Sequence, residues 1–132
     1  MILLLLALHC GDSFHLRYEA RAVGLPDRRV EAIARVETAC NLNPRLRAHD
    51  CRAPRRDCEV GRFQIKPSTA RQRCSCVDVR TYRNNVACFL LTFAEDRARF
   101  GLTDATVRHN GYGPAGAYEY LYKVLKVEEG LP

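Results

Sequence analysis

The segment DRRVEAIARVET, residues 27–38, predicts an amphipathic helix that carries one acidic residue on its apolar face. It follows Leu25 and Pro26, and Asp27 is a favourable residue at a helix N-terminus. Four residues spaced at i, i+3, i+4 and i+7 share one face of this helix: Val30, Ile33, Ala34 and Glu37. We expect this face to be buried, with Glu37 at its end.

Glu37 is the first candidate for a catalytic residue. Burial disfavours the charged form of a carboxyl group, so we expect the pKa of Glu37 to rise. A carboxyl group that keeps its proton near neutral pH can act as a general acid. The structural alternative is a polar residue that ends the apolar face and reaches solvent or an arginine. Glu31 and Arg35, in contrast, are expected to form an exposed i,i+4 pair.

Length and charge limit the class of protein. A chain of 132 residues is expected to form one domain with one hydrophobic core. The net charge of +6 indicates a basic surface, which would attract a bacterial cell wall, an anionic membrane or nucleic acid. The arginines are scattered and are not interleaved with aromatic residues, so we expect no nucleic-acid partner.

Residues 1–10 form an apolar segment that is too short to span a bilayer but has the length of a signal-peptide core. We therefore expect an exported protein, periplasmic or extracellular; a buried N-terminal segment is the alternative. Cys10 follows the leucine-rich run, as at a lipoprotein processing site. His9 stands where that pattern requires a small residue, which argues against a lipid anchor at Cys10.

Apart from Cys10, the chain has six cysteines: Cys40, Cys51, Cys58, Cys74, Cys76 and Cys88. An even number in a small exported chain favours three disulfides in an oxidising compartment. Cys74 and Cys76 are too close in sequence to pair easily, so Cys88 is the expected partner of one of them. The rest of the connectivity stays open.

A zinc site is the alternative to disulfides. Its ligands would be Cys74 and Cys76, together with His49 or His109. No Cys-x-x-Cys pair is present, although structural zinc sites usually use that spacing. We therefore expect neither a metal nor another cofactor.

The remaining pattern is mainly helical. Helices are expected from Pro67 through Arg71, from Asn84 to a stop at Gly101, from Thr103 or Asp104 through Arg108, and after Pro114 with Ala117, Leu121, Val124 and Leu125. Between them lie a long loop from Cys40 to Cys58 and a glycine-rich loop from His109 to Pro114. Phe63 and Ile65 alternate about Gln64, as in a short strand or extended turn. The fold class is thus mainly α, a small helical domain held by disulfides.

Three ordered motifs resemble those of the soluble lytic transglycosylase domain. The first is Glu37 and Thr38 with Asn43 and Pro44, the second is Gly61–Ile65 with Pro67–Ala70, and the third is Asn110–Pro114. The family pattern is Glu-Ser with an Asn-Pro, then Gly-Leu-Met-Gln-Ile with Pro-x-Thr-Ala, then Ala-Tyr-Asn-Ala-Gly. The match covers about residues 25–127, and the catalytic domain is expected at residues 20–127.

The resemblance implies a lysozyme-like α+β fold with a cleft for peptidoglycan glycan strands, acting as a monomer. Glu37 would protonate the glycosidic oxygen between N-acetylmuramic acid and N-acetylglucosamine. It would then take the proton from the C6 hydroxyl as this oxygen closes on C1, which forms a 1,6-anhydromuramoyl end. Because no water is consumed, this reaction does not need the second carboxylate of ordinary glycoside hydrolysis.

The resemblance also implies a set of residues that contact substrate. Gln64 would line the cleft, and Phe63 would either form an apolar wall for a sugar or pack in the core. Asn110 matches the family's Asn, whereas His109 replaces the family's Tyr. An imidazole there could donate a hydrogen bond, with a charge that changes near neutral pH, or be purely structural. Tyr112 is a candidate for the missing hydroxyl group.

Two other departures from the family are Thr38 for Ser and Arg62 for Leu, which we expect to shift subsite preference. A hydrolase like goose-type lysozyme remains an alternative, with its second carboxylate from Asp50, Asp57 or Glu59. A second alternative is a cell-wall binder without activity, for which His109 is the only hint. A buried Glu37 argues against the binder, because burying an unneeded carboxylate is costly. Association with a membrane or an envelope complex stays open.

Overall fold

The computed structural model describes residues 9–42, 44, 57–75, 77–110 and 114–132. These residues form the helices α2 (Ser13–Ala22), α3 (Asp27–Thr38), α4 (Pro67–Arg73), α5 (Tyr82–Phe100), α6 (Leu102–Asn110) and α7 (Pro114–Gly130). The prediction of a mainly helical domain is confirmed, since the described part of the chain has one isolated β-bridge, Val60–Ile65, and no strand. None of the helices in these ranges is long and apolar enough to cross a membrane.

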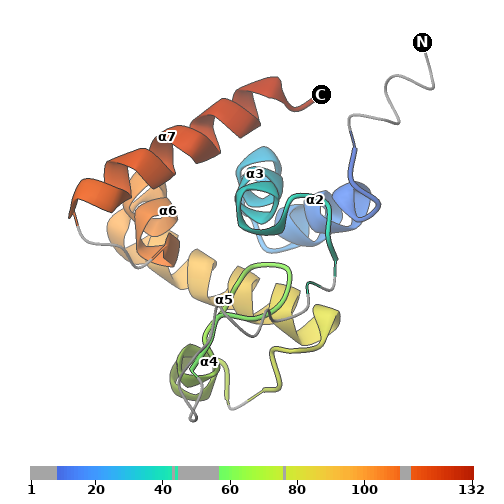
Figure 1. Ribbon diagram of the computed structural model, residues 1–132, viewed down its shortest axis with the longest axis vertical. Helices are drawn as coiled ribbons and strands as arrows, with labels where there is room; N and C mark the ends of the chain where they lie inside the picture. Colours follow the sequence, from blue (N-terminus) through green and yellow to red (C-terminus); the bar gives the residue numbers. More distant parts are fainter. Residues whose placement is uncertain (1–8, 43, 45–56, 76, 111–113) are drawn as a thin grey trace.

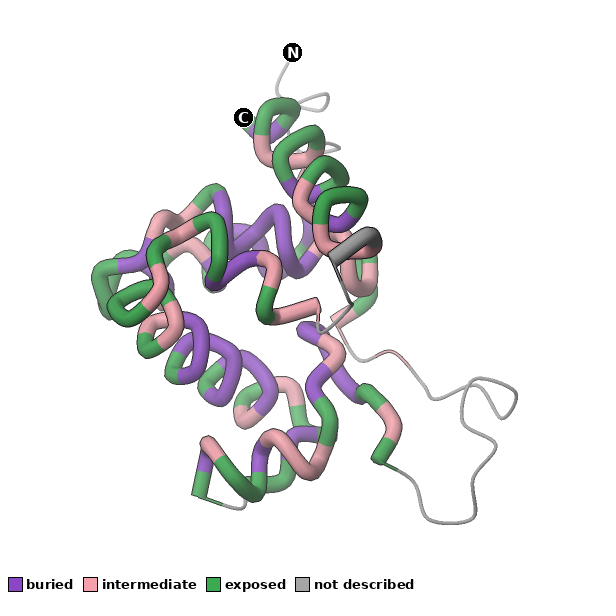
Figure 2. The backbone as a smooth tube through the Cα atoms, turned by 90° about the vertical axis from the view of Figure 1, so that its left-hand side faces the viewer, coloured by how far each residue is buried: buried purple, intermediate pink, exposed green. Residues whose placement is uncertain are grey.

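Helix α3 lies between α2 and α7, and α5 passes beneath them with α6 packed against it (Figure 1). Four apolar residues of α3 are fully buried, and Val36 is partly buried against the core: the four are Val30, Ala32, Ile33 and Ala34. Buried residues lie on the helix faces that are turned toward one another (Figure 2). The helix predicted from residues 27–38 is therefore the central element, as its apolar face required.

The helix ends follow the local sequence. Helix α5 begins two residues before the predicted Asn84 because the Thr81 hydroxyl accepts a hydrogen bond from the Asn84 amide, 3.3 Å away. It ends where Gly101 takes a φ of 90°, as predicted. Helix α6 extends further than expected, so His109 and Asn110 lie on its last turn and not in a loop.

Helix α2 was not predicted. Its buried residues include Leu16 and Ala20, but the large apolar side chains Phe14 and Tyr18 are 70% and 66% exposed. With apolar residues on both faces, the segment lacks the one-sided pattern from which an amphipathic helix is recognised.

The pair Glu31–Arg35 corrects a prediction. Glu31 is fully buried rather than exposed, because α2 brings Arg17 over it. Arg17 Nε lies 2.5 Å and Arg35 Nη2 3.4 Å from the carboxylate oxygens of Glu31. Burial alone would raise the pKa of Glu31, but hydrogen bonding and the two arginine charges outweigh it and lower the pKa.

Arg62 also has a different role from the one predicted. Its side chain is fully buried, and its Nε forms an ion pair with Asp12 Oδ2 at 2.9 Å. Its Nη1 donates to the carbonyl oxygens of Ala34 and Ala39, each at 2.8 Å, while Thr38 Oγ1 donates to the Arg62 carbonyl oxygen at 2.8 Å. Arg62 and Thr38 therefore fasten the turn at residues 60–65 to the end of α3, and Arg62 cannot contact a substrate.

Residues 60–65 form a tight turn closed by the Val60–Ile65 bridge, and not the short strand or extended turn that the sequence predicted, because Gly61 and Gln64 both take a positive φ. Asn85 of α5 holds it: the side-chain oxygen accepts from the Phe63 amide, and the nitrogen donates to the Val60 carbonyl oxygen, each at 2.8 Å. Gly61 has a φ of 76°, and a Cβ atom there would lie 2.2 Å from the Asn85 side-chain nitrogen. Glycine is thus required at this position, and Gln64 is held at a φ of 51°.

Disulfide bonding is confirmed, with one correction. Cys74 pairs with Cys88, as predicted for one of the two neighbouring cysteines, and Cys58 is also disulfide-bonded. Cys51 and Cys76 lie outside the described residues. Cys10, which the sequence analysis set aside, pairs with Cys40 across the end of α3. Its sulfur atom is thus occupied in this structure and is not free to carry a lipid.

Candidate functional site

Glu37 lies on the last turn of α3 and is partly buried. Burial of its carboxyl group, and then the nearby charge of Glu59, raise its pKa from 4.5 to about 8. The Tyr120 hydroxyl lowers the pKa of Glu37, but by less than these two effects raise it. The predicted direction of the shift is confirmed, and a carboxyl group with this pKa is largely protonated at neutral pH, as a general acid requires.

Tyr120, on α7, supplies the aromatic hydroxyl group next to Glu37. The residue is 6% exposed, and its buried hydroxyl makes no hydrogen bond of standard geometry within the described ranges, although it lies close enough to Glu37 to favour the charged form of that carboxyl group. Burial and the Glu37 charge raise the pKa of Tyr120. Tyr112, from which the sequence analysis expected a hydroxyl group, lies outside the described residues, so that expectation stays a prediction. No motif in the sequence indicated Tyr120.

His109 is held by the core. Its Nε2 lies 2.8 Å from the Phe63 carbonyl oxygen, and its ring meets the Phe89 ring edge to face with centroids 4.9 Å apart. Burial lowers the pKa of His109 to about 4. The expectation of a charge that changes near neutral pH is therefore wrong, and the neutral imidazole donates from Nε2 to the turn.

Phe63 lies in the core and does not form a wall for a sugar. Its side chain is fully buried and stacks on Phe89, with ring centroids 3.8 Å apart and planes 2° apart. A ligand cannot reach it, so its predicted contact with substrate is wrong. The same residue pair anchors the turn that presents Gln64.

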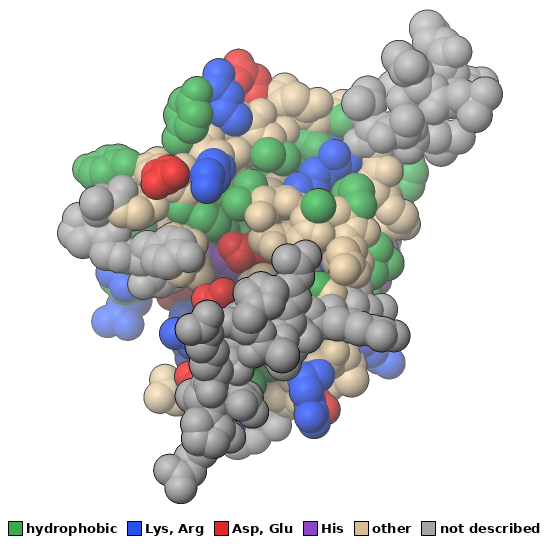
Figure 3. Space-filling view, in the orientation of Figure 1, with side chains coloured by type: hydrophobic (Ala, Val, Ile, Leu, Met, Phe, Trp, Pro, Cys, Tyr) green, Lys and Arg blue, Asp and Glu red, His purple; other side chains and the backbone are tan. Residues whose placement is uncertain are grey.

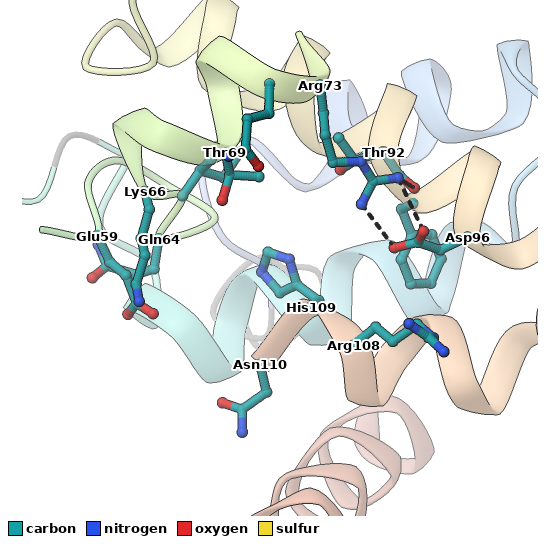
Figure 4. A pocket seen from close by; sticks show the side chains of 13 residues that line it. Glu59, Gln64, Lys66, Thr69, Arg73, Thr92, Asp96, Arg108, His109 and Asn110 are labelled. Carbon is teal, nitrogen blue, oxygen red and sulfur yellow. Dashed lines mark hydrogen bonds and ion pairs between the residues drawn. The ribbon is translucent and has the colours of Figure 1, made fainter. Parts of the chain in front are cut away.

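A cavity of about 490 Å³ lies between the 60–65 turn, α4, α5 and α6. The residues around it are Glu59, Gln64, Ile65, Lys66, Thr69, Gln72, Arg73, Thr92, Phe93, Asp96, Arg108, His109 and Asn110. Glu59, Gln64 and Lys66 lie at one end of this wall, and Arg73 and Asp96 lie at the other (Figure 4).

Three of the predicted substrate residues therefore meet at one cavity: Gln64, His109 and Asn110. Glu37 is not part of the cavity wall. Its link to the cavity is Glu59, whose charge raises the pKa of Glu37. The residue Glu59 itself is exposed, but partial burial of its carboxyl group raises its pKa, against the lowering effect of Lys66.

Sequence reasoning missed several residues of the cavity wall. Thr69 lies in the Pro67–Ala70 segment of the second motif, which was a usable signal. Arg73 and Asp96 come from α4 and α5, and no sequence spacing indicates that they meet. Asp57, one candidate second carboxylate, instead accepts a hydrogen bond from the Ser68 amide at 2.7 Å and so caps α4. Asp50 lies outside the described residues.

Charged groups are mixed over the surface. Lysine and arginine side chains alternate with acidic ones on the face shown in Figure 3, without one large basic patch. Among the described residues, no group of three or more His, Cys, Asp or Glu side chains could hold a metal ion. Cys74 is not available as a ligand of the alternative zinc site, because its sulfur is bonded to Cys88.

We compared the chain with protein-family models, with curated proteins and with solved structures. No family model, curated protein or solved structure matches it.

Proposed function

We propose that the protein is a peptidoglycan lytic transglycosylase with Glu37 as its general acid and base. The observation that carries this proposal is the Glu37 carboxyl group, partly buried at the end of α3 with its pKa raised to about 8. The three ordered motifs of the sequence support the choice of substrate. The disulfides are consistent with export to an oxidising compartment.

In this mechanism protonated Glu37 gives its proton to the glycosidic oxygen, and the bond to C1 of the muramic sugar breaks. The resulting carboxylate takes the proton of the C6 hydroxyl group as that oxygen bonds to C1. The enzyme is restored without water, and the product carries a 1,6-anhydro ring. The Tyr120 hydroxyl would stabilise the carboxylate between these steps, since a hydrogen bond to the charged form favours it.

The cavity would bind the glycan through polar side chains. Gln64 and Asn110 offer amide groups at its wall, and the backbone around Gln64 is fixed by Asn85. His109 would act as a positioning residue, because its imidazole is bonded to the turn and neutral.

A hydrolase is the second candidate, and Glu59 is the observation that favours it. Glu59 lies at the cavity wall, and its charge reaches Glu37. A second carboxylate near the acid could activate a water molecule or stabilise positive charge on the sugar. Of the three carboxylates considered from the sequence, Glu59 is the one that the described structure leaves available for this role.

A digest of purified peptidoglycan separates the two reactions. Wild type, Glu37→Gln and Glu59→Gln are compared by mass spectrometry of the released fragments, and Glu129→Gln is the control for loss of an exposed carboxylate. A transglycosylase releases fragments one water lighter than hydrolytic ones, Glu37→Gln releases none, and Glu59→Gln keeps the same products. Hydrated ends that disappear with Glu59→Gln would establish the hydrolase. No release by folded wild type would overturn both.

A further inference from the structure

Arg108, on α6, is a cation of the cavity wall that the proposed reaction does not use. Its guanidinium carbon lies 3.5 Å from the centre of the Phe100 ring, so the planar group stacks on the ring. The described residues contain no ion-pair partner for it. Arg108 is exposed, and an arginine that stacks on an aromatic ring and has no hydrogen-bond acceptor among the described residues is suited to bind a carboxylate.

No described acidic residue forms an ion pair with Arg108, Asp104 at i−4 on the same helix included. Asp96 is the acidic residue at the same end of the cavity, and both of its oxygens bind Arg73: Nη1 to Oδ2 at 3.2 Å and Nη2 to Oδ1 at 2.9 Å (Figure 4). At the other end, the positive charge of Lys66 acts on Glu59. The wall therefore carries three cations, Lys66, Arg73 and Arg108, against the two carboxylates Glu59 and Asp96.

Asn110 provides a second donor without a partner. Its Nδ2 atom is buried and makes no hydrogen bond within the described ranges, although Asn110 is part of the cavity wall. A buried amide donor without a partner is costly, so a bound carbonyl or hydroxyl group would stabilise it. The cavity wall thus combines a residue with an unpaired amide donor, Asn110, and a cation without an ion-pair partner among the described residues, Arg108.

We propose that Arg108 forms a carboxylate-binding subsite, so that the cavity selects the acid-bearing parts of its ligand. This inference rests on the proposed function for the identity of that ligand. Peptidoglycan carries carboxylates from two sources: the lactyl group of muramic acid where the stem peptide is absent, and the stem peptide itself. Both present the same acceptor to the guanidinium group.

Arg99 provides a matched control. Its guanidinium carbon also lies over the Phe100 ring, at 5.1 Å from the centre, but Arg99 is not part of the cavity wall. Arg108→Gln and Arg99→Gln each remove one positive charge next to the same aromatic ring. If Arg108 acted only through its stacking on Phe100, or through the general positive charge, the two variants would behave alike.

The test is a titration at pH 7 by NMR of the full chain, followed through chemical-shift changes. The probes are N-acetylglucosamine, N-acetylmuramic acid, and an N-acetylmuramoyl dipeptide that ends in D-glutamate. We expect wild type and Arg99→Gln to bind at least one acidic probe about fivefold or more tightly than the neutral sugar, and Arg108→Gln to lose this preference. Preference for muramic acid identifies the lactyl group, and preference for the dipeptide alone identifies the stem.

Equal binding of all probes by wild type, or a preference that survives in Arg108→Gln, would overturn the inference. The same would follow if both arginine variants lost the preference equally. Binding is measured without turnover, so the result is separate from the digest. A preference that depends on Arg108 in a protein that releases no fragments would retain the subsite and reject the catalytic proposal.

Discussion

Replacing Glu37 with glutamine should make the protein more stable, and increasingly so as the pH rises. The pKa of Glu37 is about 8 in the folded protein and 4.5 in its ordinary state. Below pH 4.5 the carboxyl group is protonated in both states and contributes no difference. Between pH 4.5 and 8 the unfolded chain ionises while the folded protein keeps the proton, so wild type loses stability relative to the variant.

The size of this effect follows from the difference in pKa. Each pH unit in this interval corresponds to about 1.4 kcal/mol, which gives an upper limit of about 4–5 kcal/mol by pH 8. Solvent at the partly exposed carboxyl group reduces the value. Above pH 8 the folded carboxyl group ionises too, and the difference becomes constant. A total of this size is a large part of the usual stability of a small domain.

The assay is urea unfolding followed by circular dichroism at pH values from 4 to 9, with the disulfides intact. The difference in unfolding free energy between Glu37→Gln and wild type is plotted against pH, and Glu129→Gln is the control for the removal of a carboxylate at an exposed site. A difference for Glu37→Gln that does not vary with pH, or that falls as the pH rises, would refute the placement of Glu37 in a desolvated position. It would also remove the main support for its role as an acid.

Other predictions concern residues that support the site. Tyr120→Phe removes the hydroxyl that lowers the pKa of Glu37, so the alkaline limb of the pH–activity profile should move to higher pH. The control Tyr122→Phe, on the exposed face of α7, should leave the alkaline limb in place. Arg62→Ala leaves the buried carboxylate of Asp12 without its ion pair, so urea unfolding should show a free energy of unfolding lower by about 3–5 kcal/mol. Wild-type stability in Arg62→Lys would contradict a requirement for the several donors of the planar guanidinium group. Replacing both Cys74 and Cys88 with serine removes the disulfide that joins the end of α4 to α5. The free energy of unfolding should fall by about 3 kcal/mol, since the bond closes a loop of 14 residues. An unchanged thermal midpoint would contradict this.

Local features of this protein follow from short stretches of its sequence. The spacing of Val30, Ile33 and Ala34 predicted the central helix, because a helix face is defined by neighbours three and four residues apart. Its start was predicted one residue late, since Pro26 and not Asp27 is the N-cap residue. The same periodicity predicted that the Glu37 carboxyl group would be desolvated and its pKa raised. Glycines at positions 61 and 101 marked the turn and the end of α5, since both positions need a positive φ.

The contacts between side chains of different helices follow from the way the helices pack. Glu31 appeared exposed until α2 brought Arg17 over it, and Arg62 appeared to be a subsite residue until Asp12 paired with it in the core. Phe63 and His109 belong to one aromatic cluster, and Tyr120 approaches Glu37 from a helix more than 80 residues away. Sequence periodicity reports the environment of a residue along its own helix. Partners from distant helices are chosen by packing and by the need to pair buried charges, which no local pattern records.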